Sequence, residues 1–246
     1  MLYYMGWVSY SQHYPVGTEL FLRHCGSAKI GTFDSSHGYM DRDKILDTWM
    51  KRPLSWSQLS QFWYSKNQWV DTYLLNNRFP PNAGMDFGNV VGDTLGLGKK
   101  KSMVPKLEKY LTGEKEHEMH VKLNKKMLVG YADHYCPEKK ILNENKTSQR
   151  IDRWNQKAVD THGQLTMYAL MILLRDGTIP DQLEIWLNFI PVENREFGGM
   201  WIPDRDEFHR FQTTRTAKEC LAFGSLIEKT HKDMEQFANI VKLPDC

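Results

Sequence analysis

The sequence predicts an α/β domain with a central mixed sheet, in which an antiparallel meander is flanked by helices. Three observations predict this class. Apolar residues recur at helical spacing from residue 41 to about residue 111, alternation replaces that spacing at 117–146, and helix and strand patterns then succeed one another to residue 240. Apolar residues make up 41% and charged residues 25% of the chain, a balance that is typical of globular proteins.

The N-terminal segment differs in pattern from the rest of the chain. Five glycines and Pro15 interrupt residues 1–40, and neither periodicity persists there. We therefore predict an irregular segment over 1–40 and a single domain over 41–246. The first element of that domain is a short amphipathic helix at 41–51, which Pro53 ends.

Three more helices are predicted before the sheet. Ser55 or Ser57 can cap the first of them, which continues to about residue 74. The stretch MDFGNVVGDT predicts the second, because its apolar residues are spaced to face a core. The third is predicted at 103–111, before the alternating pattern begins.

The meander and the elements after it follow in order. The meander consists of strands at 117–123, 127–135 and 140–146, with turns at Asn124-Lys125 and 136–139. The elements predicted after it are a long helix at 153–175, ended by Asp176-Gly177, strands at 182–192 and 207–213, and a helix from Thr216 to residue 240.

Positive charge is concentrated in one part of the chain. Residues 99–157 contain 15 Lys and Arg against 8 Asp and Glu, whereas the rest contains 17 against 22, although the net charge is only +2. A basic segment in a mildly acidic chain is expected of a protein that binds a polyanion. A solvated charged surface would give the same count, so charge alone leaves both interpretations open.

The cysteines and the start of the chain bear on the compartment. Cys25, Cys136, Cys220 and Cys246 stand far apart without a C-x-x-C pair, which favours reduced thiols over disulfides or a closed zinc site. The first residues lack the pattern of a signal peptide, and no apolar run approaches the ~18 residues of a membrane-spanning helix. We therefore expect a cytoplasmic protein that does not associate with a membrane.

Two carboxylates and an ammonium are predicted to meet at the end of the meander. Glu144 and Lys146 lie two residues apart on one strand and therefore point the same way. The hairpin brings Asp133 beside them. Carboxylates suit Mg²⁺, which takes phosphate oxygens as further ligands, and a lysine can position water or neutralise developing charge. A salt-bridge ladder on a polar strand face would show the same pattern.

The order of five sequence pieces resembles the PD-(D/E)XK nucleases, in their RecB-type and lambda-exonuclease-like branch. The pieces are LSWSQLSQFW, FGNVVGDTL, VGYADHY, LNENKT and HGQLTMYAL, and they extend from about Ser55 to Leu170. The resemblance implies the PD-(D/E)XK nuclease fold and a Mg²⁺-dependent deoxyribonuclease of the exonuclease type, with Mn²⁺ as a substitute metal. It implies DNA as a partner, and a phage-type recombination or repair protein as a candidate second partner.

The resemblance also implies roles for individual residues. Asp133 and Glu144 would hold the metal with help from the carbonyl of Asn145, and Lys146 would be the catalytic lysine. Gln164 and Tyr168, one helical turn apart, would orient water or substrate. The basic residues expected to contact DNA phosphates are Lys99, Lys100, Lys101, Arg150, Arg153 and Lys157.

Two departures from the family pattern bear on the metal site. The family often places histidine or glutamate four residues after the first glycine of FGNVVGDTL, where this chain has Gly92. The adjacent Asp93 is either a substitute metal ligand or an exposed helical aspartate. Iron–sulfur members of the family carry four cysteine ligands whose spacing this chain lacks, so we expect no iron–sulfur cluster.

Two other functions fit the same residues. A catalytically inactive nucleic-acid-binding module on the same fold is favoured by Gly92, whereas the intact Asp133, Glu144 and Lys146 argue against it. A structural α/β protein with a salt-bridge ladder would need neither metal nor DNA. Metal-dependent DNA cleavage would distinguish the nuclease from both alternatives.

Overall fold

The computed structural model describes residues 42–77, 80, 82–195 and 199–241, so the irregular segment predicted for 1–40 lies outside the described residues. The α-helices are α1 (Arg42–Lys51), α2 (Trp56–Tyr64), α3 (Lys66–Trp69), α4 (Ala83–Thr94), α5 (Gln156–Asp160), α6 (Gly163–Asp176) and α7 (Ala217–Ile240). The strands are β1 (Leu54–Ser55), β2 (Glu114–Leu123), β3 (Lys126–Cys136), β4 (Ile141–Ser148), β5 (Glu184–Pro191), β6 (Glu193–Arg195), β7 (Gly199–Trp201) and β8 (His209–Thr213). None of the helices in these ranges has both the length and the hydropathy needed to cross a membrane.

The helices begin where the sequence provides capping side chains. Ser55 accepts a backbone N–H of the first turn of α2, as predicted. Ser65 then caps α3, so the helix predicted to continue to residue 74 is interrupted and ends in a π-helical turn. Thr216 and Glu219 form a capping box at the start of α7. Local side-chain chemistry thus fixes these boundaries.

The main sheet is mixed and contains the predicted meander. Its strand order is β1-β3-β4-β5-β8, and β2 pairs with β3 outside this path. Strands β2, β3 and β4 are antiparallel in succession, whereas β1 is parallel to β3 and β4 is parallel to β5. Strands β6 and β7 form a separate two-stranded sheet. The predicted α/β class with a mixed sheet is therefore confirmed.

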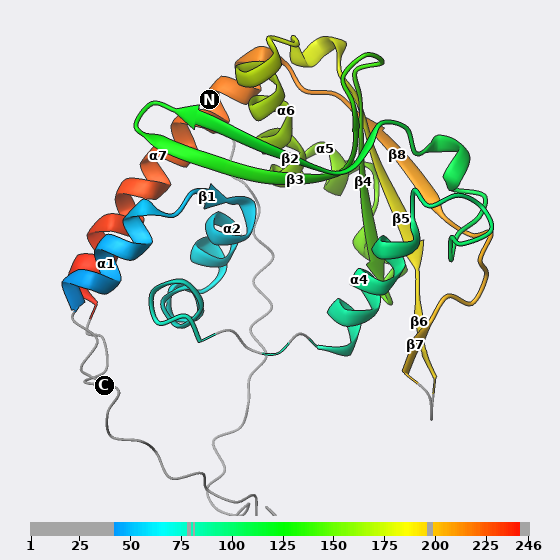
Figure 1. Ribbon diagram of the computed structural model, residues 1–246, viewed down its shortest axis with the longest axis horizontal. Helices are drawn as coiled ribbons and strands as arrows, with labels where there is room; N and C mark the ends of the chain where they lie inside the picture. Colours follow the sequence, from blue (N-terminus) through cyan, green and yellow to red (C-terminus); the bar gives the residue numbers. More distant parts are fainter. Residues whose placement is uncertain (1–41, 78–79, 81, 196–198, 242–246) are drawn as a thin grey trace, which may run out of the picture. The chain divides into compact units, whose positions relative to one another are not determined.

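Strand β3 changes partners along one of its edges. Strand β2 pairs with β3 along the other edge, whereas β1 pairs only at Leu128 and Val129 and β4 only from His134 onward. The change coincides with a bend of the β2–β3 pair that Figure 1 shows. Glu116 on β2 has a φ of 51° at the position across from Asp133. Asp133 therefore lies where β3 and β4 begin to diverge.

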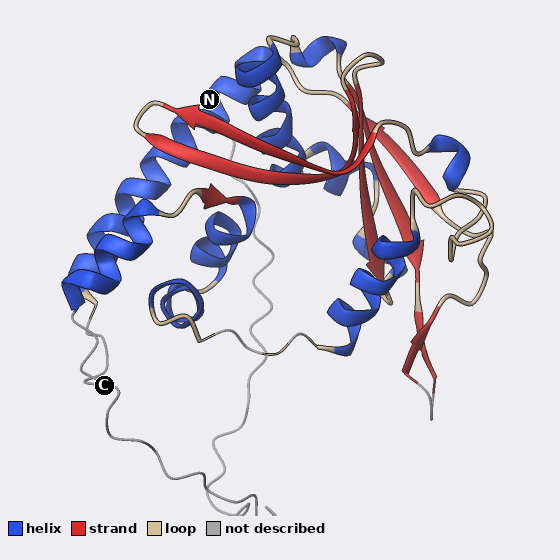
Figure 2. Ribbon diagram, in the orientation of Figure 1, coloured by secondary structure: helices blue, strands red, loops and turns tan. Residues whose placement is uncertain are grey.

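Helices cover both sides of the sheet (Figure 2). Helix α6 packs against β2 and β3, and with α1, α2 and α7 it encloses a large apolar cluster that includes Trp69, Leu128 and Phe189. Helix α4 packs against β4 and encloses a smaller cluster that includes Val91 and Ile190. The polar residues at the carboxyl end of the meander therefore lie between two separately packed apolar clusters.

The prediction of a helix at 103–111 is wrong. This segment is a loop with a single 3₁₀ turn at Glu108–Tyr110. The Glu108 carboxylate accepts the backbone N–H groups of Gly96 at 3.0 Å and Gly98 at 2.9 Å, which ties the segment to the end of α4. These amides of the glycine-rich loop are therefore occupied by a carboxylate of the same chain.

The helix predicted at 153–175 is divided into α5 and α6. Asn155 caps α5, and the buried Arg215 donates hydrogen bonds to the carbonyl oxygens of Val159, near the end of α5, and His162, just before α6. Its guanidinium also donates to Thr166 Oγ1 at 2.8 Å. Strands β1, β6 and β7 were not predicted, because two or three residues are too few to show alternation.

Arg215→Met should lower the free energy of unfolding by on the order of 3 kcal/mol or more, because several buried oxygens would lose their donor. Urea denaturation followed by circular dichroism measures the change. Lys157→Met is the control, since Lys157 is exposed and surface substitutions usually stay within about 0.5 kcal/mol. Equal midpoints for both variants would contradict a structural role for Arg215.

Candidate active site

Strands β3 and β4 bring three of the predicted site residues together. Lys146 Nζ donates to Glu144 Oε1 at 2.5 Å. Asp133 Oδ2 accepts the backbone N–H of Asn145 at 2.6 Å, in the place where β3 and β4 no longer pair through their backbones. The Asp133 carboxylate thus connects β3 to β4 just beyond their last backbone pair, which is His134 with Asn143.

Burial raises the pKa values of the two carboxylic acids of the site, Asp133 and Glu144. Glu144 is 2% exposed, and its Oε2 has no hydrogen-bond partner among the described residues. Burial and the Asp133 carboxylate raise the pKa of Glu144 to about 7. Burial also raises the pKa of Asp133, although the Lys146 ammonium opposes it. Burial lowers the pKa of Lys146, but the two carboxylates outweigh this effect and raise it overall.

The oxygen atoms at this point fit a hard divalent cation. The unpaired Glu144 Oε2 and the Asp133 carboxylate are ligands of the kind that Mg²⁺ prefers. The N–H and C=O of one strand residue point to the same edge, so the Asn145 carbonyl also faces the diverging β3. Within the described ranges, no three His, Cys, Asp or Glu residues are arranged to enclose a metal. Asp133 and Asn145 line a cleft, so an ion held there could keep several of its waters, as Mg²⁺ does.

Two residues of the trio formed by Asp133, Glu144 and Lys146 line a cleft of about 860 Å³ between α4 and the diverging strands. These are Asp133 and Lys146, whereas Glu144 is buried and does not line the cleft. Asp93 and Gly92 line it from α4. A Cβ added at Gly92 would meet no described atom within 4 Å, so open space occupies the position where the family pattern has histidine or glutamate.

Tyr168 contacts β3, and neither it nor Gln164 lines the cleft. Gln164 Nε2 donates to the Tyr168 hydroxyl at 2.8 Å, and that hydroxyl donates to the Tyr131 carbonyl at 2.5 Å. Tyr131 lies in the stretch of β3 that pairs with neither β1 nor β4. Burial and the Glu144 carboxylate raise the pKa of Tyr168. The pair therefore fixes the β3 backbone two residues before Asp133.

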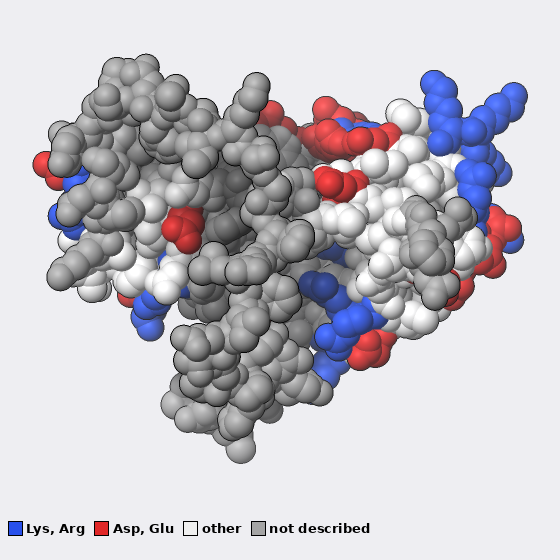
Figure 3. Space-filling model, turned by 90° about the horizontal axis from the view of Figure 1, so that it is seen from below, with Lys and Arg blue, Asp and Glu red and all other residues white. Residues whose placement is uncertain are grey.

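Arg153 is the one predicted DNA-contacting residue that lines the cleft among the residues described. Residues 99–101 are exposed in the loop after α4, and Lys157 is exposed on α5. Arg150 pairs with Asp152 at 3.2 Å on the surface. Figure 3 shows Lys and Arg side chains gathered near the middle of the face in view and again at its upper right. Of the basic residues predicted to contact DNA, Arg153 therefore lies in the cleft, and the others lie on the surface outside it.

Two cleft residues on β2, Lys115 and Glu116, are absent from the predicted site. Lys115 Nζ donates to the Asp93 carbonyl at 2.7 Å, which links β2 to the end of α4. Glu116 faces the cleft beside Asp133. The predicted turn at Asn124-Lys125 is enough to identify Glu116 as a neighbour of the site. Counting back from that turn along both strands places position 116 opposite position 133.

Comparisons with known proteins show similarity in the fold, to two solved structures described as exonucleases. No protein-family model and no curated protein sequence matches the chain. A structure from Eubacterium rectale, described as a "putative exonuclease", matches with a TM-score of 0.53 and 12% identity, over 87% of this chain and 90% of that chain. A structure described as a "phage related exonuclease" from Haemophilus somnus 129PT matches with a TM-score of 0.50 and 15% identity, over 79% and 92%. The α/β fold with a mixed central sheet is therefore similar to the folds of these two exonuclease structures, as the sequence resemblance implies.

Proposed function

We propose that the protein is a Mg²⁺-dependent deoxyribonuclease of the exonuclease type, which hydrolyses DNA phosphodiester bonds and accepts Mn²⁺ in place of Mg²⁺. The observation that carries the proposal is the buried Glu144 with an unpaired carboxylate oxygen, next to Asp133 and bonded to Lys146, at the edge of an open cleft. The fold shared with exonucleases supports DNA as the substrate.

Each residue has a distinct role in this proposal. Asp133, Glu144 and the Asn145 carbonyl would hold the metal, and Asp93 lines the same cleft from α4. A bound Mg²⁺ supplies Lewis-acid polarisation of the phosphate and a more acidic water. Lys146 holds a positive charge beside the carboxylates, where it stabilises negative charge that develops on a phosphate oxygen.

Residues around the trio position it and bind substrate. Gln164 and Tyr168 act as the accessory pair by holding the β3 backbone next to Asp133. Arg153 lies on the cleft wall and contacts DNA phosphates there. The exposed lysines at 99–101 extend the phosphate-binding surface beyond the cleft.

A cleavage assay with the full chain tests the proposal. Circular duplex, blunt linear duplex and single-stranded DNA are incubated with Mg²⁺, Mn²⁺ or EDTA. Metal-dependent shortening of linear DNA, with circular DNA left intact, is the expected result. The open space at Gly92 favours one alternative, an inactive binding module, for which DNA binding without cleavage would be the evidence. Neither binding nor cleavage would indicate a structural protein.

Replacing Lys99, Lys100 and Lys101 together with alanine should weaken DNA binding and reduce the slope of log K against log salt by up to about 2.7. The reason is that DNA releases fewer counterions on binding when fewer lysines neutralise its phosphates, whereas turnover at saturating DNA should change little. Fluorescence anisotropy at several salt concentrations measures the slope. The matched control replaces the exposed α7 lysines Lys218, Lys229 and Lys232. An unchanged slope would show that residues 99–101 do not contact DNA phosphates and form an ordinary solvated surface.

A further inference from the structure

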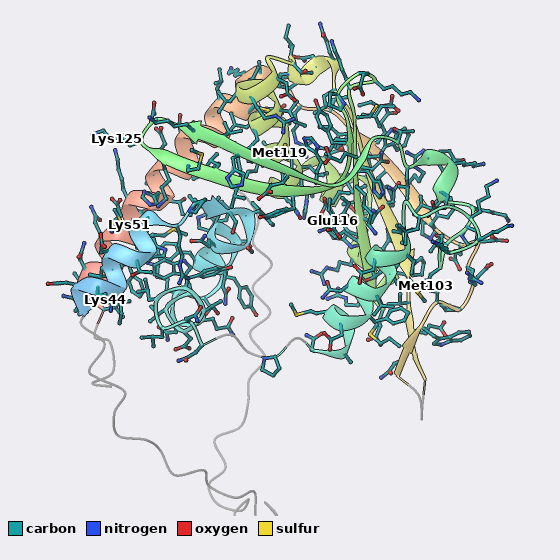
Figure 4. All side chains as sticks on the ribbon, viewed as in Figure 1. Lys44, Lys51, Met103, Glu116, Met119 and Lys125 are labelled. Carbon is teal, nitrogen blue, oxygen red and sulfur yellow. The ribbon has the colours of Figure 1, made fainter. Side chains whose placement is uncertain are left out.

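Glu116 occupies an exceptional position on β2. Its neighbours Lys115 and His117 pair with His134 and Ala132, so Glu116 stands across from Asp133, but this pair is missing from the backbone ladder. Its φ of 51° belongs to the left-handed region that non-glycine residues seldom adopt. Figure 4 labels Glu116 close to the bend of the β2–β3 pair. The backbone at this point therefore departs from strand geometry beside Asp133.

The departure places a carboxylate in the cleft. Glu116 is exposed and lines the same cleft as Asp133 and Lys146. Its negative charge is close enough to contribute to the raised pKa of Asp133. On the other wall, Gly92 has no side chain, and the space that a side chain would enter is open to the described atoms around it. Glu116 thus adds a carboxylate to the cleft from β2, whereas α4 has no side chain at Gly92.

The buried Glu144 supplies an independent reason to expect a cation here. Its Oε2 is enclosed and has no partner among the described residues, although Glu144 as a whole is 2% exposed. A buried carboxylate oxygen without a donor is costly unless a ligand satisfies it. Glu144 is bonded to Lys146, which lines the cleft that Glu116 also lines, so a cation that satisfies Oε2 would be near that cleft.

We propose that Glu116 is the third carboxylate of the metal site, and that β2 supplies it in place of the ligand that the family pattern draws from the helix of FGNVVGDTL. This inference rests on the proposed metal-dependent function. No three acidic or histidine side chains in the described ranges enclose an ion directly, and Mg²⁺ keeps several of its waters. In this proposal Asp133 and Glu144 would bind the ion directly, and Glu116 would reach it through one of the waters that the ion keeps.

The test measures Mn²⁺ binding to the full chain without DNA, by electron paramagnetic resonance and titration calorimetry. Glu116→Gln keeps the length of the side chain and removes its charge. We expect its Mn²⁺ dissociation constant to rise by about 10–100-fold, as for other outer ligands. Cleavage should fall by a similar factor at low Mn²⁺ and recover as Mn²⁺ is raised.

Two further variants separate loss of the ligand from loss of the fold. Glu116→Gly relieves the left-handed backbone and should weaken Mn²⁺ binding equally, with no loss of thermal stability. Glu118→Gln is the matched control, because Glu118 lies two residues away on β2, is bonded to His120 and Tyr131, and does not line the cleft. It should bind Mn²⁺ as the parent does.

The outcomes distinguish this inference from the proposed function. A parent chain that neither binds Mn²⁺ nor cleaves DNA would overturn both, and this is visible before any variant is compared. A parent that binds and cleaves, together with a Glu116→Gln variant of unchanged Mn²⁺ affinity, would overturn only the role of Glu116. Weakened binding in Asp93→Asn but not in Glu116→Gln would also overturn it, since the third carboxylate would then come from α4.

Discussion

Replacing Lys146 with methionine should slow DNA cleavage at saturating metal by on the order of 10²–10³-fold. Methionine keeps the apolar stem but removes the Nζ that donates to Glu144 Oε1. The transition state of phosphodiester hydrolysis then loses a positioned positive charge, whereas metal ligands and phosphate contacts remain. Lys146→Arg should restore little activity, because a planar guanidinium does not reproduce a compact ammonium.

Single-turnover cleavage of labelled linear duplex measures the change, and anisotropy shows whether DNA is still bound. Lys140→Met is the control, since Lys140 precedes the same strand and bonds Gln182 on the surface. The Glu144 side chain is 3% exposed, so its pair with Lys146 is not an exposed salt-bridge ladder. Because the Lys146→Met variant leaves a buried carboxylate without its partner, its metal-free form should be less stable than the parent, and Mg²⁺ should restore that stability. A variant that cleaves within a few-fold of the parent rate would remove Lys146 from the mechanism.

Asp133→Ala and Glu144→Ala should each abolish metal-dependent cleavage, because each removes a proposed metal ligand. Without metal, DNA binding should persist or tighten slightly, since each variant removes a negative charge near the phosphates. Asp133 also accepts the Asn145 N–H, so Asp133→Asn, which keeps an acceptor oxygen, separates metal binding from the link between the strands.

Cleavage, Mn²⁺ affinity and DNA affinity are measured in parallel for these variants. Glu138→Ala is the control, because Glu138 lies in the exposed turn between β3 and β4. Parent-like cleavage by either the Asp133 or the Glu144 variant would exclude that residue from catalysis. A loss of DNA binding in both would indicate that the carboxylates maintain the fold of the cleft.

The sequence predicted the parts of the fold that depend on local periodicity. Alternation and a short turn suffice to place Asp133 beside Glu144 and Lys146, because register and facing are fixed within one hairpin. Helix boundaries at Ser55 and Thr216 also follow from capping chemistry within one turn. These features need no knowledge of the rest of the chain.

Features that depend on distant residues could not be predicted in this way. The division between α5 and α6 involves Arg215, which follows β8 in the chain. Arg215 bonds the carbonyl oxygens of Val159, near the end of α5, and His162, just before α6. The segment 103–111 becomes a loop because Glu108 bonds the amides after α4. Glu116 is an intermediate case, since its partner follows from the hairpin register but its left-handed backbone does not follow from its residue type.

The pairing of two carboxylates with one ammonium has a thermodynamic consequence for a nuclease of the proposed kind. When all three groups are charged, the trio of Asp133, Glu144 and Lys146 carries one net negative charge and repels a phosphate. A divalent cation converts this into one net positive charge, equal and opposite to that of a single phosphodiester. Metal and DNA then increase each other's affinity by the same factor. Scarcity of metal therefore loosens the hold on substrate at the same time as it stops cleavage.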